Sequence, residues 1–320
     1  MRHFLTLLDW SGAEIRRLLA DAAKAKAKRK NAKGIKSLAN RVVALIFEKP
    51  SLRTRVSFET AIAQLGGTSL FLVGQEVGLG TRETIPDCAR TLSEYVDAVV
   101  LRTFRHATIE EFAAYARCPV INALSDCYHP CQALGDLLTM QEIFTTLQGR
   151  TVAFVGDGNN VARSLAIGCG KLGMRFVLAC PQSYGFDQAF LELYQSHIPD
   201  SELIICHDPR EAVTSADVIY TDVWASMGQE NERERRLKQF RSYQVNEELL
   251  ALAPPHARIM HCLPAHRGEE ITSEVLESER SVVFQQAGNR LYVQKALLQW
   301  LFSDKKSSPA AKNRERSAHR

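Results

Sequence analysis

The sequence predicts an α/β protein of two domains, each a mainly parallel sheet flanked by helices. Two observations lead to this fold class. Short β-branched segments alternate along the chain with longer segments of helical periodicity, as in βαβ units. The 320 residues also suffice for two domains of about 150 residues, each large enough to bury a core. The last helix follows the final predicted strand, and we expect it to cross back to the first domain.

Nine segments have the length and composition of buried strands, and several longer segments between them have helical periodicity. The predicted strands are residues 41–47, 69–73, 98–102, 120–122, 151–155, 175–179, 203–206, 218–221 and 258–261. The clearest predicted helices are residues 56–65, 84–95, 109–116 and 136–144, and a last helix is predicted at residues 289–302, after the final strand. The order of these segments is that of repeated βα units.

A break in the pattern near Gly149 divides the chain. We expect residues 1–140, with the helix at 289–303, to form a first domain, and residues 141–288 to form a second. Residues 304–320 are rich in Lys, Ser, Pro and Ala, and we expect them to be a disordered tail.

The formal charge of +4 belongs to that tail, because residues 305–320 alone carry a net +5 and the rest of the chain −1. A second basic run at residues 24–36 has no interleaved aromatic residues, which favours a solvated helix face over a site for single-stranded nucleic acid. No apolar run approaches the ~18 residues of a membrane span. We therefore expect neither nucleic acid nor a membrane as partner.

The eight cysteines show no CxxC spacing, and the amino terminus has no secretory signal pattern. We therefore expect reduced thiols and a cytoplasmic location. Cys127 and Cys131 flank His129, which raises the question of a metal site. No second Cys/His pair stands at ligand spacing, so we expect no metal.

The strongest candidate site follows the first strand. Ser51 is placed to cap the next helix, whose first turn then carries Leu52, Arg53, Thr54 and Arg55. Free backbone N–H groups, a hydroxyl and guanidinium groups together form a site for a dianion. The positive end of the helix dipole disfavours arginine in the first turn unless an anion binds nearby. An anion-binding site is therefore favoured over a solvated surface.

A second motif places His129 directly before Pro130, at the expected start of a helix, with Gln132 one turn along. A neutral imidazole there can donate to a carbonyl oxygen, and the Gln132 amide can bind an –NH2 or C=O group. A purely structural histidine is the alternative for this motif taken alone.

The segment GDGNN at residues 156–160 follows a strand, as in a dinucleotide-binding loop. Val161 stands where the third glycine of that motif belongs, and no acidic residue closes the next strand. A dinucleotide-dependent oxidoreductase is therefore the alternative from another class. Asn159 and Asn160 are instead suited to a polar small molecule.

Two later loops also leave buried strands, at the sheet edge where open α/β proteins bind ligands. Asp222 and Ser226, with the backbone N–H groups that follow, suit the ammonium and carboxylate of an α-amino acid. Cys262 and Leu263 open the next loop, and an ordinary core thiol is the alternative for Cys262. Arg290 adds a guanidinium at the expected start of the last helix.

On these motifs the chain resembles the aspartate/ornithine carbamoyltransferase family. The matching motifs are SLRTR at 51–55, Arg102 after an apolar strand, HPCQ at 129–132, DxxxSMG at 222–228 and HCLP at 261–264. They occur in the family's order, and the last two resemble its ornithine branch. The resemblance implies carbamoyl transfer from carbamoyl phosphate to L-ornithine, without a cofactor, by a homotrimer or a multiple of trimers. Another amine acceptor, N-acylornithine or putrescine, is the alternative within the family.

The resemblance also implies roles for particular residues. It implies that carbamoyl phosphate is bound by Ser51, Leu52, Arg53, Thr54, Arg102, His129, Gln132, Cys262, Leu263 and Arg290. It implies that ornithine is bound by Asn160, Asp222, Ser226 and Met227, and that Arg102, His129, Asp222 and Cys262 are catalytic.

Two positions depart from the family pattern. Leu52 stands where the phosphate motif usually has threonine, which removes one hydroxyl and keeps the backbone N–H. Gly78 stands where similar enzymes have His or Gln, and the resemblance implies that this side chain reaches the phosphate of the adjacent subunit. Glycine has no side chain to make that contact.

Overall fold

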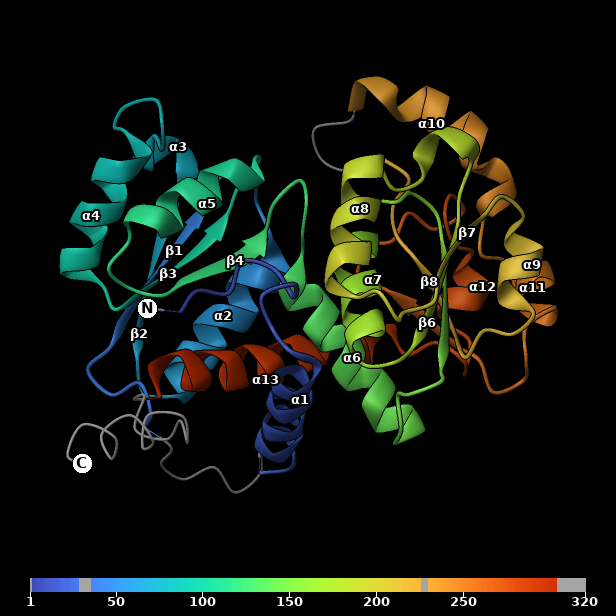
Figure 1. Cartoon of the computed structure of the whole chain (residues 1–320), viewed down its shortest axis with the longest axis horizontal. Helices are drawn as coiled ribbons and strands as arrows, with labels where there is room; N and C mark the ends of the chain where they lie inside the picture. Colours follow the sequence, from blue (N-terminus) through green and yellow to red (C-terminus); the bar gives the residue numbers. More distant parts are fainter. Residues whose placement is uncertain (1, 29–35, 226–229, 304–320) are drawn as a thin grey trace, which may run out of the picture.

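The computed structural model describes residues 2–28, 36–225 and 230–303. Two α/β lobes lie side by side, each built around a parallel sheet (Figure 1). The first sheet has the strand order β2-β1-β3-β4, with β1 (Val42–Phe47), β2 (Thr68–Val73), β3 (Ala98–Arg102) and β4 (Val120–Leu124). Its helices are α1 (Gly12–Ala27), α2 (Leu52–Gln64), α3 (Gly74–Val77), α4 (Ile85–Tyr95), α5 (His106–Tyr115) and α6 (Pro130–Phe144).

The second sheet has the strand order β7-β6-β5-β8-β9. Its strands are β5 (Thr151–Val155), β6 (Arg175–Ala179), β7 (Leu203–Cys206), β8 (Val218–Thr221) and β9 (Arg258–His261). The helices that follow are α7 (Asn160–Lys171), α8 (Gln188–His197), α9 (Pro209–Val213), α10 (Arg233–Phe240), α11 (Glu247–Ala251), α12 (Ser273–Leu276) and α13 (Val283–Phe302). Both sheets are therefore parallel and flanked by helices, as predicted.

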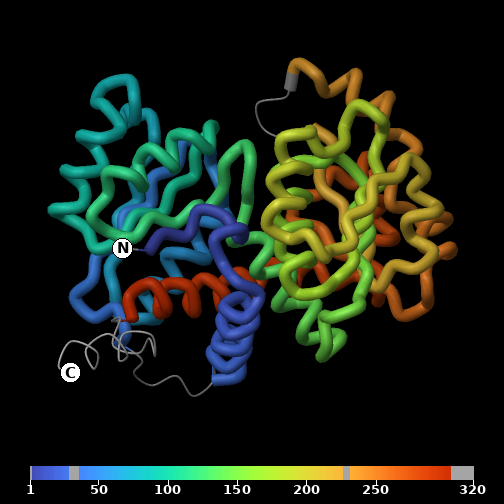
Figure 2. Tube along the Cα trace, viewed as in Figure 1, coloured from blue at the N-terminus to red at the C-terminus, as the bar shows by residue number. Residues whose placement is uncertain are grey.

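The last helix crosses back to the first domain. Figure 2 shows α13, in red, lying against the first lobe, and it packs on α1, α2 and α6. Its buried residues Val293 and Leu297 join a core that also contains Trp10 and Phe58. The ring of Trp300 lies 4.2 Å from that of Trp10. This crossing brings residues of the second half of the chain to the site of the first.

The predicted start of that helix was wrong. Helix α13 begins at Val283, six residues before the predicted start at 289, so Arg290 lies inside the helix and not at its amino end. Gly288 suggested a boundary, but a Cβ there would meet nothing within 4 Å, so this glycine occupies an open face within the helix. Helix α5 also begins earlier than predicted, at His106 and not at residue 109, whereas α2 and α6 begin directly after Ser51 and His129, as the motifs at 51–55 and 129–132 predict.

The strand orders place two ligand crevices. In the first sheet β1 lies between β2 and β3, and in the second β5 lies between β6 and β8. At such switch points successive connections leave on opposite faces, so the carboxyl ends of the strands open a crevice. In the described ranges no helix combines the length and apolarity that a membrane span requires, and all eight cysteines are free thiols.

Candidate active site

The two crevices join in one cleft of about 1030 Å³ between the domains. It is lined by residues at or after the carboxyl ends of β1, β3, β4, β5, β6, β8 and β9, and by one residue of α13. The predicted site residues that line it are Ser51, Leu52, Arg53, Thr54, Arg102, His129, Gln132, Asn160, Asp222, Cys262, Leu263 and Arg290. The other two, Ser226 and Met227, lie outside the described residues.

The amino terminus of α2 forms one wall. Ser51 caps the helix, and its Oγ accepts a hydrogen bond from the Thr54 N–H at 3.3 Å. Thr54 is buried, whereas the Leu52 side chain is 75% exposed. Leu52 therefore offers the cleft its backbone, and the loss of a hydroxyl at this position leaves the helix cap intact.

Two buried arginines converge behind this turn. Arg290 donates to Thr54 Oγ1 at 2.9 Å and to Gln132 Oε1 at 3.2 Å. Burial, with the positive charges of Arg290 and Arg53, lowers the pKa of Arg102 to about 10. Among the described residues, neither the Nε of Arg102 nor that of Arg290 has a hydrogen-bond partner. Buried donors without partners are rare in folded proteins, and here they suit an anion.

His129 lies beside these arginines at the start of α6. Its backbone N–H donates to Ser164 Oγ at 2.8 Å, which ties this helix end to the second domain. Burial, followed by the charges of Arg290 and Arg102, lowers the pKa of the imidazole well below its ordinary value. The ring is therefore neutral, and it can donate one hydrogen bond without adding a further positive charge.

The opposite wall carries an acid and a thiol. Cys262 Sγ donates to Asp222 Oδ1 at 2.8 Å, and Asn159 Nδ2 donates to Asp222 Oδ2 at the same distance. Burial, and then the charge of Asp222, raises the pKa of Cys262 well above its ordinary value. The thiol is therefore protonated, and its role is that of a hydrogen-bond donor and not of a nucleophile.

The GDGNN loop uses its groups for packing and capping. Asn159 caps α7 by accepting from the N–H groups of Val161 and Ala162, at the helix end where a dinucleotide phosphate would bind. A Cβ at Gly158 would lie 2.8 Å from the carbonyl carbon of Gly185. Asn160 Nδ2 donates to the Ser125 carbonyl across the cleft at 2.5 Å.

Sequence reasoning missed an ion pair in the cleft wall. Arg236 Nη1 lies 2.6 Å from Asp157 Oδ2, and the same nitrogen donates to the Trp224 carbonyl. Burial raises the pKa of Asp157, while Arg236 opposes that shift. Asp157, the acidic residue inside GDGNN, was the only hint of this ion pair in the sequence motifs, but its partner Arg236 lies in a polar segment 79 residues away.

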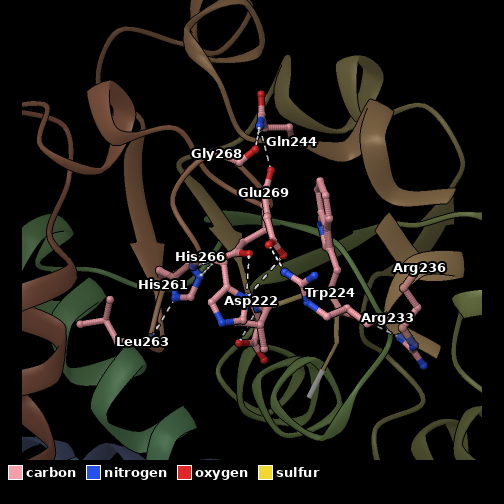
Figure 3. Close-up of polar contacts among 12 residues, drawn as sticks. Asp222, Trp224, Arg233, Arg236, Gln244, His261, Leu263, His266, Gly268 and Glu269 are labelled. Atoms are coloured by element: carbon pink, nitrogen blue, oxygen red, sulfur yellow. Dashed lines mark hydrogen bonds and ion pairs between the residues drawn. The ribbon is translucent and has the colours of Figure 1, made fainter. Parts of the chain in front are cut away.

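The loop after β9 is held from behind by His261. Its Nδ1 accepts from the Leu263 N–H at 2.8 Å (Figure 3). Its Nε2 lies 3.1 Å from Glu270 Oε1. Both His261 and Glu270 are fully buried. The Leu263–Pro264 peptide is cis, and Leu263 has a φ of 56°. This network fixes the backbone of the residues that face the cleft.

Two groups in the described chain have potential metal-ligand atoms within 4.8 Å of one another, Asp222–His261–Cys262 and His266–Glu269–Glu270. In the first group both ring nitrogens of His261 already face protein partners, and the Cys262 thiol is protonated. The three residues of this first group therefore do not fit a metal ion as they stand.

Gly78 has a structural reason to be glycine. It lies in the left-handed region with φ 62°, and a Cβ there would lie 2.7 Å from the Cβ of Arg82. A longer side chain at this position therefore requires a different loop conformation.

Comparisons with known proteins agree with this geometry. Residues 2–142 match the carbamoyl-P binding domain of aspartate/ornithine carbamoyltransferase, and residues 148–301 match its Asp/Orn binding domain. Ornithine carbamoyltransferase of Geobacillus stearothermophilus is 51% identical over 299 residues, which cover 93% of this chain and 96% of the relative. The anabolic enzyme of Pyrococcus furiosus is 50% identical over 299 residues, which cover 93% and 95%.

Among solved structures, ornithine carbamoyltransferase from Pyrococcus furiosus superposes with a TM-score of 0.90 at 49% identity and covers 93% of this chain and 96% of that one. Both halves of the chain thus match in sequence, and the whole matches in fold. The chain belongs to the aspartate/ornithine carbamoyltransferase family.

Proposed function

We propose that this chain transfers the carbamoyl group of carbamoyl phosphate to the δ-amine of L-ornithine, giving L-citrulline and phosphate. The observation that carries the proposal is a single cleft with two contrasting sides. On one side lie the buried Nε atoms of Arg102 and Arg290, which have no hydrogen-bond partner within the described part of the chain, and on the other lies the Asp222–Cys262 pair. The two arginines suit a dianion, and the Asp222–Cys262 pair suits an amine. Relatives about half identical to this chain are named ornithine carbamoyltransferase.

In this proposal the phosphoryl group binds at the amino terminus of α2. The first-turn N–H groups after Ser51 point toward it, and Leu52 contributes only such an N–H. Arg53 and Arg102 neutralise its two charges through charge-assisted hydrogen bonds.

The carbonyl oxygen of carbamoyl phosphate lies between three donors, Thr54, Arg102 and His129. Because Thr54 Oγ1 accepts from Arg290, its own hydrogen remains available for donation. As the amine attacks, negative charge develops on this oxygen, and each aligned donor stabilises it by about 3–4 kcal/mol. The –NH2 group donates to Gln132 Oε1 and to the Leu263 carbonyl.

The acceptor occupies the second-domain wall. Asp222 binds the α-ammonium group of ornithine, and Asn160, Ser226 and Met227 bind its carboxylate. Asn160 must then exchange its contact with the Ser125 carbonyl for the substrate. Asn159, which already bonds Asp222, is a further residue of this half-site.

The δ-amine must be neutral to attack, although an unperturbed alkyl ammonium has a pKa of about 10. Desolvation in the closed cleft favours the neutral amine, and Cys262 lies beside it. The new N–C bond forms as the C–O bond to phosphate breaks. The amine proton passes to the departing phosphate, so the reaction requires no protein base.

The same proposal extends to assembly, location and direction. A homotrimer, or a multiple of trimers, is supported by the exposed apolar side chains of Leu52, Val56, Leu70 and Val73 on two neighbouring elements, α2 and β2. Since Gly78 offers no side chain to a neighbour, we expect each subunit to bind phosphate without it. A role in arginine biosynthesis agrees with the relative that is named anabolic, and we expect a cytoplasmic location.

An acceptor panel tests the proposal. Purified protein with carbamoyl phosphate should form citrulline from L-ornithine and no carbamoylated product from N-acetylornithine, putrescine or aspartate. Transfer to another amine in preference to ornithine would overturn the assignment within the family. A titration with NADH monitored by nicotinamide fluorescence should show no binding, and saturable binding would favour the oxidoreductase.

A further inference from the structure

A buried carboxylate behind the cleft has no role in the reaction described above. Asp136 lies one turn after Gln132 on α6, the helix that lies between the two domains (Figure 1), and its side chain is fully buried. It does not line the cleft, so no substrate contacts it. Its position next to a substrate-facing amide makes it the strongest candidate for a positioning residue.

Three donors converge on Asp136. Gln132 Nε2 and Gln286 Nε2 donate to Oδ1 at 2.8 and 2.7 Å, and the Tyr220 hydroxyl donates to Oδ2 at 3.2 Å. Burial raises the pKa of Asp136 to about 7, and these donors oppose the shift. A proton on Oδ2 would face Tyr220, so Oδ1 accepts from both amides in either protonation state.

These contacts fix which way round the Gln132 amide lies. Its Nε2 faces Asp136, and its Oε1 faces Arg290 at 3.2 Å. Arginine has only donors and Oδ1 is an acceptor, so a flipped amide would lose both bonds and set two donors against each other. Gln132 therefore presents an oxygen, and never an –NH2, to the cleft.

An oxygen at this point recognises a donor. We infer that Asp136 is a specificity-determining positioning residue, which orients Gln132 so that the site selects an acyl phosphate bearing –NH2 over one bearing –CH3. The inference rests on the proposed function. Acetyl phosphate has the same phosphate and carbonyl groups as carbamoyl phosphate, but its methyl group leaves the Gln132 oxygen without a hydrogen.

The test compares how well the two acyl phosphates bind. The dissociation constant of carbamoyl phosphate and the inhibition constant of acetyl phosphate, competing against it, are measured for the full chain at a pH well above 7. Wild-type protein should bind acetyl phosphate about 10–100-fold more weakly, the range expected for one buried hydrogen bond left unmade.

Asp136→Ala should weaken carbamoyl phosphate binding about tenfold and leave acetyl phosphate binding nearly unchanged, so that the ratio of the two constants collapses. A merely structural loss would weaken both ligands equally and leave the ratio unchanged. Asp136→Ser, whose shorter polar side chain does not reach Gln132, replaces the alanine variant if circular dichroism shows that the latter is unfolded.

Asp136→Asn is the matched control. It keeps an oxygen toward both amides and turns its –NH2 toward the Tyr220 hydroxyl, so it should retain the wild-type ratio. An unchanged ratio in the alanine or serine variant, or a ratio lost equally in the asparagine variant, would overturn the inference. Absence of carbamoyl transfer by the wild-type protein would instead overturn the proposed function.

Discussion

The two walls of the cleft handle charge in opposite ways. On the side of α2 and α6, burial and the charges of Arg290 and Arg53 lower the pKa of Arg102, burial also lowers the pKa of Arg290, and no described acid in hydrogen-bond contact neutralises Arg102. On the side of β5 and β8, the charged groups already have hydrogen-bond partners inside the protein. Arg236 bonds Asp157, and Asp222 accepts from protein donors on both of its oxygens.

This difference shows which half of the site is already formed. A cluster of uncompensated cations binds a dianion with little rearrangement, because its field and its donors are in place beforehand. A network whose members bond one another must exchange partners when a substrate arrives. We call the side of α2 and α6 the cationic wall and the side of β5 and β8 the paired wall. We therefore expect substitutions on the cationic wall to have larger effects on activity than substitutions on the paired wall.

The largest effect is expected at Arg102. Arg102→Gln should lower kcat/KM for carbamoyl phosphate by about 10³-fold, because it removes a charge from the phosphate and a donor from the developing oxyanion. Steady-state phosphate release measures this. Arg105→Gln, an exposed arginine three residues along, is the control and should change little. An equal loss of kcat/KM in the two variants would contradict the role of Arg102 in binding the phosphate and the developing oxyanion.

A smaller and more selective effect is expected at Asp222. Asp222→Asn should raise the KM for ornithine about 100-fold, since the ammonium loses its charged partner, and leave the KM for carbamoyl phosphate within about twofold. The exposed Asp200→Asn serves as a control. If the variant affects both substrates alike, the two walls do not divide the substrates as proposed.

The same Asp222→Asn variant should make Cys262 more reactive. The charge of Asp222 is, after burial, the main reason for the raised pKa of this thiol, so its removal should increase the thiolate fraction and speed alkylation about tenfold. Mass spectrometry of the Cys262 peptide after iodoacetamide treatment gives the rate, and Cys206 in the same sample is the internal reference. Unchanged alkylation would show that the contact with Asp222 does not set the thiol's acidity.

A modest effect on stability is expected at His129. Because burial and the arginines lower its pKa, the unfolded chain binds a proton below pH 6.5 that the folded protein excludes. Stability should therefore fall with acidification, by up to about 1.4 kcal/mol per pH unit for this one group. His129→Asn should reduce that slope in denaturant titrations between pH 6.5 and 5. Identical slopes would mean that His129 is charged in the folded state.

The strands were predictable because most are short, β-branched, buried runs between turn residues, and the observed strand at 151–155 begins and ends where the sequence indicates. Helix starts were less predictable. Glycine at 288 suggested a boundary that packing of α13 against α6 overrides. Local propensity cannot register such long-range packing.

The cationic wall was predictable from local motifs, because each motif spans only a few consecutive residues. Ser51 is followed directly by the first helical turn that it caps, and His129 directly precedes Pro130. The paired wall was not. Arg236 reaches Asp157 across 79 residues. On the cationic side, the contacts of Asp136 with Gln132, Gln286 and Tyr220 join three separate elements and were not predictable either. Such networks have no signature in a single sequence, because each member is an ordinary polar residue until the fold brings them together.

The contrast between the walls is tested most directly by titrating L-ornithine into the protein with and without phosphate, at matched ionic strength. Ornithine carries a net positive charge and enters beside Arg102 and Arg290, so a dianion on the cationic wall should remove their repulsion. We predict that phosphate tightens ornithine binding about tenfold or more, a coupling of ordinary size for two ligands in one site. Equal affinity in the two titrations would contradict the account.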